Sequence, residues 1–208
     1  MFEKSMVLKR KRIKSINPDC ETIVLFSLFL CGIILGVFII KNCNNEVKEA
    51  FNTLLRNFFS AKSGCGFISC FSGTLVFFVI FIAFSFLFGM CAVGTPLVWA
   101  VPIFFGVICS SYVSLMLINY GLKGLFYCIL VDMLPYAITT ATLVKCCCES
   151  TKLSVNLFSC IAGGNAFKGK NLFKEYSVNY LILCVPVLIG AIISAFCFKI
   201  FQSLFIFV

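Results

Sequence analysis

Residues 67–118 read FISCFSGTLVFFVIFIAFSFLFGMCAVGTPLVWAVPIFFGVICSSYVSLMLI, and this stretch decides the fold. It lies within a run, residues 63–122, that contains no Asp, Glu, Lys or Arg. A helix needs about 20 apolar residues to cross the hydrocarbon core of a bilayer, so the run is too long for one crossing. Gly94-Thr95-Pro96 divides it, because proline cannot continue a helix and glycine often ends one. We predict a tight hairpin here, with one membrane-spanning helix on each side.

Composition and spacing place three more apolar helices beside this hairpin. The chain is 61% hydrophobic and only 12% charged, whereas soluble domains carry about 25% charged residues. The short link Asn119–Lys123 leads directly into the next apolar segment. We therefore predict an all-α fold, a single polytopic membrane helical bundle over residues 1–208, with short interfacial amphipathic helices. The five predicted spans are residues 22–40, 67–93, 96–118, 124–144 and 180–198.

Several function classes are excluded by the residue types of the chain. It has no histidine, which excludes a serine–histidine or cysteine–histidine triad and a histidine zinc ligand. The net charge is +9, but the basic residues form no aromatic-interleaved patch, so nucleic acid is not an expected partner. Half of the 14 cysteines fall inside the predicted spans, where free cysteine acts as a small hydrophobe. We predict no catalytic residue, no cofactor and no metal site.

The first polar loop contains a candidate docking surface. Apolar residues recur at helical spacing between positions 46 and 59, with Glu46 and Glu49 early and Arg56 late, as the helix dipole favours. The pattern predicts an amphipathic helix on the membrane face. Its apolar stripe either packs on the end of the bundle or docks a partner, and the sequence leaves both interpretations open. The stripe consists of Val47, Phe51, Leu54, Leu55 and Phe58.

One carboxylate lies inside a predicted span. Asp132 occurs about eight residues into the fourth span, three residues before Pro135, which we expect to kink the helix. A carboxyl group at this depth is costly and is by default a functional hypothesis. Either it is hydrogen-bonded to groups freed near Pro135, or it takes part in ion or proton movement.

Small residues and charges predict packing and orientation. Small side chains at four-residue spacing on the first and third spans permit close helix approach. Residues 145–179 are predicted to form a polar stretch between the fourth and fifth spans. With the N-terminus inside, inner segments hold eleven basic residues and outer segments six, which favours a cytoplasmic N-terminus and an extracytoplasmic C-terminus. The small residues concerned are Gly32, Gly36, Gly106, Ser110 and Ser114.

Three motifs between residues 88 and 144 carry a family resemblance. The Gly-Thr-Pro hairpin divides two spans, Phe-Phe-Gly at 104–106 begins a small-residue face, and Asn-Tyr-Gly-Leu-Lys-Gly at 119–124 leads into a span with Leu134-Pro135. In these motifs and in its overall layout, the chain resembles the stage II sporulation protein M family of endospore-forming bacteria. Family members often place a polar residue directly after this Leu-Pro, whereas Tyr136 follows here.

The resemblance implies a non-enzymatic membrane scaffold. Such proteins act in the septal membrane of the mother cell during engulfment, where they recruit peptidoglycan hydrolases, a lytic transglycosylase and an amidase. The partners expected for this chain are therefore membrane lipids and such enzymes. The alternative is a small-solute or ion transporter or channel subunit that uses Asp132. Transporters usually show repeated halves, and five spans do not divide evenly, which favours the scaffold.

Overall fold

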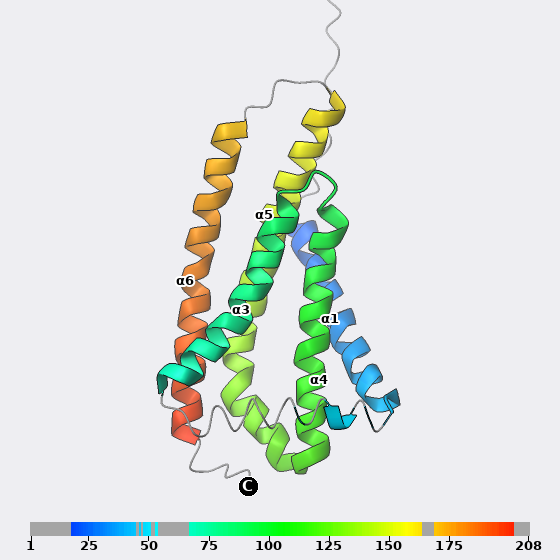
Figure 1. The fold of residues 1–208 in the computed structure, drawn as a ribbon, viewed down its shortest axis with the longest axis vertical. Coiled ribbons are helices and arrows are strands. Elements are labelled where there is room, and N and C mark those ends of the chain that lie inside the picture. The colour runs from blue at the N-terminus through cyan, green and yellow to red at the C-terminus, as the bar shows by residue number, and fades with distance from the viewer. Residues whose placement is uncertain are drawn as a thin grey trace, which may run out of the picture.

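Five long helices and one π-helical turn form the part of the chain that the computed structural model describes, namely residues 18–44, 46, 48–50, 53, 67–163 and 169–201 (Figure 1). The predicted all-α fold is confirmed. The elements are α1 Pro18–Asn42, α3 Phe67–Gly89, α4 Thr95–Tyr127, the π-helix η1 Cys128–Asp132, α5 Met133–Gly163 and α6 Gly169–Phe201.

Four helical runs among the described residues are long and apolar enough to cross a membrane. The longest, Thr95–Ile161, comprises α4, η1 and α5, and it turns back on itself near the lower end of the bundle (Figure 1). The turn occurs at Gly121, whose φ of 58° and ψ of −142° suit glycine because it has no Cβ. α4 and α5 are therefore antiparallel, and the reversal falls inside the link predicted at residues 119–123.

The turn between α3 and α4 begins earlier than predicted. α3 ends at Gly89 and not at residue 93. The backbone N–H groups of Cys91 and Gly94 then donate to the carbonyl groups of Phe88 and Cys91 at 3.1 and 3.0 Å, which closes a turn. Gly94 consequently forms the N-cap of α4 and does not end α3 as predicted. Pro96 lies in the first turn of α4, where backbone N–H groups have no carbonyl partner within the helix, so the missing N–H of proline costs no hydrogen bond.

Most of the polar stretch predicted at residues 145–179 is helical. α5 continues to Gly163 and α6 begins at Gly169. Both helices extend beyond the upper ends of α1, α3 and α4 (Figure 1). Ser150, Thr151 and Ser154 on this part of α5 are buried and form hydrogen bonds inside the bundle, so their polarity does not mark exposure to water.

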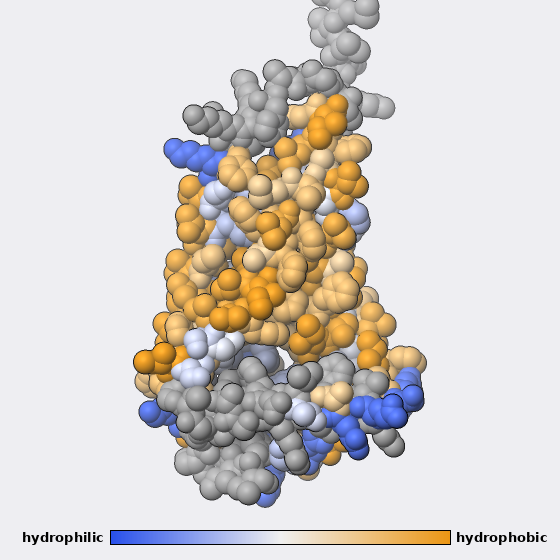
Figure 2. Space-filling view, in the orientation of Figure 1, coloured by the Kyte–Doolittle hydropathy of each residue, from blue (hydrophilic) through white to orange (hydrophobic). Residues whose placement is uncertain are grey.

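Apolar side chains fill the bundle in two clusters. The upper cluster joins all five long helices and includes Phe78, Phe105 and Leu143. The lower cluster lies near the reversal and includes Met116 and Val131. Apolar residues also form a broad band across the face shown in Figure 2, between more polar ends. A surface of this kind suits contact with lipid tails.

α1 and α4 pack backbone against backbone, as the small residues predict. A Cβ on Gly32 would lie 2.3 Å from the carbonyl oxygen of Ile103, and a Cβ on Gly106 would lie 2.5 Å from that of Phe29. Gly36 likewise faces Ser110, whose hydroxyl would lie 2.0 Å from an added Cβ. The two small-residue faces therefore belong to one interface, which the sequence did not establish.

Candidate functional site

The predicted docking stripe, Val47, Phe51, Leu54, Leu55 and Phe58, lies outside the described residues. The described residues around it, 46, 48–50 and 53, are helical. The N–H of Lys48 donates to the carbonyl of Asn44 at 3.2 Å, and the Thr53 hydroxyl donates to the carbonyl of Glu49 at 2.8 Å. Both contacts have the four-residue spacing of an α-helix.

Asp132 lies inside the bundle and is 4% exposed. Tyr112 of α4 donates its hydroxyl hydrogen to Oδ2 of Asp132 at 2.9 Å, across the antiparallel pair that the reversal creates. Tyr136 stands beside this contact, with its ring centroid 6.5 Å from that of Tyr112. The sequence singled out Asp132 but did not predict its contact with Tyr112, because residues 112 and 132 become neighbours only through the turn at Gly121.

The helix around Asp132 is a π-helix that ends just before Pro135. The N–H of Met133 donates to the carbonyl of Cys128, five residues earlier. Proline has no N–H, and its ring would clash with the carbonyl four residues before it, that of Val131. A wider turn at this position removes that conflict, and such turns often occur at functional sites. The Thr139 hydroxyl donates to the carbonyl of Pro135 at 2.8 Å.

The hairpin residues Gly94, Thr95 and Pro96 lie at the opposite end of α4 from the reversal. Ser154 of α5 donates to the carbonyl of Cys91 at 2.8 Å and accepts a hydrogen bond from the Thr95 hydroxyl at 3.2 Å. A Cβ on Gly94 would lie 1.8 Å from the carbonyl oxygen of Phe88, so a larger residue does not fit. The hairpin is therefore attached to α5.

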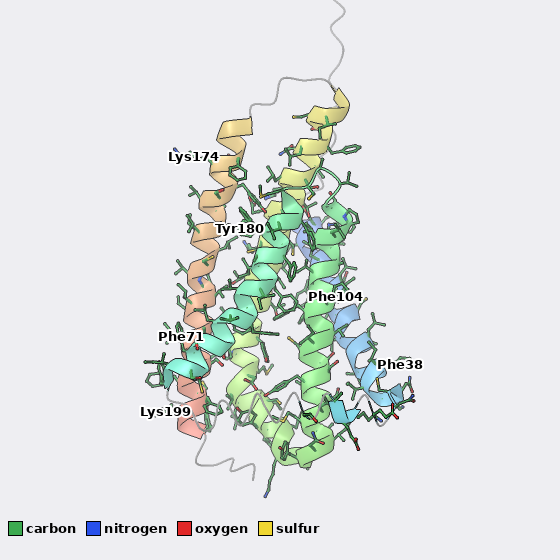
Figure 3. The ribbon with its side chains drawn as sticks, in the orientation of Figure 1. Phe38, Phe71, Phe104, Lys174, Tyr180 and Lys199 are labelled. Carbon is green, nitrogen blue, oxygen red and sulfur yellow. The ribbon has the colours of Figure 1, made fainter. Side chains whose placement is uncertain are left out.

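A buried hydroxyl cluster joins α3, α5 and α6, and the sequence did not predict it. We use this name for Ser85, Ser150, Tyr176 and Tyr180. Ser85 Oγ lies 3.0 Å from the Tyr180 hydroxyl and 3.3 Å from Ser150 Oγ, which in turn lies 3.1 Å from the Tyr176 hydroxyl. Ser150 also contacts the hydroxyl of Tyr180. Figure 3 shows Tyr180 on the upper part of α6, where that helix faces α3 and α5.

Backbone groups and aromatic rings complete the hydroxyl cluster. Tyr176 donates to the carbonyl of Phe86, and Tyr180 to that of Cys146, both at 3.0 Å. The ring of Phe86 stacks on that of Tyr176 with centroids 5.0 Å apart. Gly89 permits this approach, because a Cβ there would lie 2.7 Å from Cβ of Ser150. These hydroxyl groups therefore bond to one another and to the backbone, which suits a structural contact.

A polar layer lies beside the hydroxyl cluster at the upper end of the bundle. Glu149 forms an ion pair with Lys152 at 2.6 Å, and Asn179 of α6 donates to the same carboxylate at 3.2 Å. Glu21 of α1 is also buried, and its Oε1 has no hydrogen-bond partner among the described residues. Ionisable residues are costly inside the hydrocarbon layer, so their position here indicates that the layer ends near this level of the bundle.

The cysteines inside the bundle serve as packing residues in the described part of the chain. Cys147 Sγ lies 3.5 Å from Ser85 Oγ on α3, whereas Cys148 Sγ lies 3.6 Å from Thr22 Oγ1 on α1. Consecutive thiols thus face different helices, and no group of three His, Cys, Asp or Glu among the described residues is arranged to hold a metal ion.

Comparisons of the chain with protein-family models, with curated proteins and with solved structures found no match. The resemblance to stage II sporulation protein M proteins therefore rests on the sequence motifs alone.

Proposed function

We propose that this protein is a non-enzymatic membrane scaffold whose bundle holds an extracytoplasmic helix, residues 46–59, in position to bind a partner. The observation that carries the proposal is a set of hydrogen bonds between buried polar groups of different helices. The hydroxyl cluster joins α3, α5 and α6, and Ser154 attaches the α3–α4 hairpin to α5. Polar groups bonded in this way hold helices in one arrangement, as a scaffold requires.

The partner class follows from the family resemblance. We propose that the protein recruits or positions peptidoglycan hydrolases, a lytic transglycosylase and an amidase, during engulfment in endospore formation. The membrane would be the septal membrane of the mother cell. The positive-inside count places residues 46–59 on the outer side, where such enzymes meet their substrate.

The docking stripe supplies the test. Replacing both Phe51 and Leu55 with alanine removes two neighbours on one helix face, and loss of one buried aromatic anchor costs about 2 kcal/mol, or about 30-fold in affinity. We expect this variant to recover much less co-expressed transglycosylase or amidase in a pull-down, while Phe51→Leu recovers nearly as much as the parent.

A matched pair at the other end of the molecule controls for general loss of apolar surface. Phe158 and Ile161 of α5 are 54% and 73% exposed, and replacing both with alanine should leave recovery unchanged. Membrane abundance must be equal in all variants. Equal recovery by the Phe51/Leu55 double variant and the parent would contradict docking through this stripe.

The second candidate, an ion or small-solute transporter or channel subunit, is favoured by one observation, the buried Asp132 within a π-helix. Asp132→Asn separates the two functions, because the amide keeps the acceptor for Tyr112 but cannot carry a charge. A scaffold should retain hydrolase recovery in this variant. Loss of a transport activity at normal abundance would support the second candidate.

A further inference from the structure

The level at which α5 leaves the hydrocarbon layer follows from its contact with α1. Residues 22–40 of α1 contain no charged side chain, and they cover about 30 Å along a helix, which matches the thickness of the layer. At the upper end of this segment, Thr22 Oγ1 lies 3.6 Å from Cys148 Sγ of α5. α5 continues from Cys148 to Gly163, about 22 Å further along its axis. The upper end of α5 therefore projects out of the hydrocarbon layer.

The projecting part of α5 carries large apolar side chains at its surface. Phe158 and Ile161 are 54% and 73% exposed, and residues three apart on a helix are neighbours on its surface. They lie about 15 and 20 Å beyond Cys148 along the helix. The headgroup region adds only about 5–8 Å to each side of the hydrocarbon layer. The two side chains therefore lie past the lipid, on the aqueous side.

α6 projects beside α5 and carries a further exposed apolar residue. Asn179 of α6 bonds to α5 in the polar layer, so the part of α6 before it stands above that layer. Phe173 is 44% exposed, and the adjacent Lys174 is exposed near the upper end of α6 (Figure 3). We call residues 153–163 of α5 and 169–178 of α6 the upper extension. Its α5 part contains no charged residue.

The charge on this side of the membrane indicates the class of partner. Residues 1–21 and 145–179 together contain eleven basic and five acidic residues. A second copy of the chain would bring the same positive excess to the contact, which charge repulsion opposes. An acidic partner is attracted instead, and complementary charge also speeds association. A helix with one apolar face and one acidic face fits both the exposed apolar residues and the basic surroundings.

We propose that the upper extension is a docking surface for an acidic amphipathic helix of a peripheral protein, on the side of the membrane at which α1 begins. The apolar face of this helix covers Phe158 and Ile161, and its acidic face meets basic residues such as Lys174. The surface lies at the opposite end of α1 from Asn42, after which the outer helix of the proposed scaffold follows. Neither docking surface depends on the other.

A peptide of defined composition tests the surface. The full-length protein is placed in phosphatidylcholine nanodiscs, and the probe is a dye-labelled helix of about 18 residues, or five turns, with leucine on one face and glutamate on the other. We expect saturable binding above that of empty nanodiscs. Replacing both Phe158 and Ile161 with alanine should weaken it at least about tenfold. Replacing Leu122 and Phe126, which are 69% and 57% exposed near the reversal, should leave it unchanged.

Charge is tested separately from apolar area. Lys174→Glu reverses an exposed charge without changing an apolar residue, so it should weaken binding of the acidic peptide severalfold, as should a rise in salt concentration. A peptide with lysine in place of glutamate should bind weakly. Equal binding of the two peptides, or unchanged binding in both the Phe158/Ile161 and the Lys174 variants, would overturn the proposal.

Photo-cross-linking in cells identifies the occupant. A benzophenone amino acid replaces Phe158, and mass spectrometry maps the residue that it captures. We expect a residue within an acidic amphipathic helix of a soluble protein. Capture of a second copy of the chain, of lipid, of a segment without acidic residues or of no molecule would count against the proposal. The same amino acid at Val185, which is 53% exposed inside the predicted span 180–198, should capture lipid and shows that the reaction works.

Discussion

Two glycines of α3 differ in how closely neighbouring helices approach them. Gly89 touches α5, and an added Cβ would lie 2.7 Å from Cβ and 2.9 Å from Cα of Ser150. Gly73 has no atom within 4 Å of the same position. Both are glycines within one apolar helix, so the sequence does not distinguish them, and only the packing of α3 on α5 and α6 does.

This difference predicts that replacing glycine with alanine has opposite effects on the free energy of unfolding at the two positions. Gly89→Ala should lower the free energy of unfolding by about 1–3 kcal/mol, because backbone and side chain of Ser150 must shift. Gly73→Ala should raise it by about 0.5–1 kcal/mol, since alanine restricts the unfolded chain and meets open space. Unfolding in mixed micelles with a denaturing detergent measures both. Equal effects at the two positions would show that α3 does not approach α5 at Gly89.

Replacing Ser150 should also destabilise the protein, because it removes buried hydrogen bonds. Ser150 contacts Ser85, Tyr176 and Tyr180. Ser150→Ala leaves these hydroxyl groups short of a partner, which costs about 1–3 kcal/mol. Ser72, which is exposed and bonds only to the carbonyl of Ser69 within its own helix, is the control, and Ser72→Ala should change stability by less than about 0.5 kcal/mol. The same unfolding experiment compares them.

Among the elements, the reversal between α4 and α5 depends on one backbone conformation. Gly121 has a φ of 58° and a ψ of −142°, a region that other residues rarely adopt. It also brings Tyr112 to Asp132. We expect Gly121→Ala to destabilise the protein by about 1–3 kcal/mol, although a Cβ there would meet no atom within 4 Å.

Two readouts check the effect at Gly121. Unfolding measurements should show the loss of stability, and the Tyr112→Phe variant should then become less harmful in the Gly121→Ala background, because the contact with Asp132 is already weakened. Wild-type stability in Gly121→Ala would contradict the strained turn.

The bundle has two ends, and which of them faces the cytoplasm can be measured. Lys174 and Lys199 mark the opposite ends of α6 (Figure 3). Ser154, in the middle of the inner polar stretch of the sequence, is an unsuitable labelling position because it is fully buried and bonded to the hairpin. Asn156 of α5 and Lys123 near the reversal are both exposed.

Cysteines at these two positions, in an otherwise cysteine-free version, should differ in their reaction with an impermeant thiol reagent on intact cells. The charge count predicts that the cysteine at position 123 reacts and that the one at position 156 reacts only after the membrane is opened. Equal membrane levels are the control. The reverse pattern would place the N-terminus outside.

The sequence alone determined that this is an all-α membrane bundle, since uncharged runs near 20 residues require helices that bond their own backbone groups. It also located the reversal at Asn119–Lys123 and, to within a few residues, the turn before α4, because proline, glycine and a lysine interrupt the apolar pattern there. Both features depend on residues that are close together in the chain, and for this reason the hydropathy pattern of the sequence predicts them.

Only the tertiary structure decided the role of polar residues within α3 and α5. Ser85 stands in an apolar run, and Ser150 stands in a polar stretch, yet the two meet at 3.3 Å although 65 residues separate them. Tyr112 and Asp132 meet in the same way, through the turn at Gly121. A buried polar group is stable only when a partner is present, and that partner is supplied by folding and not by the neighbouring sequence.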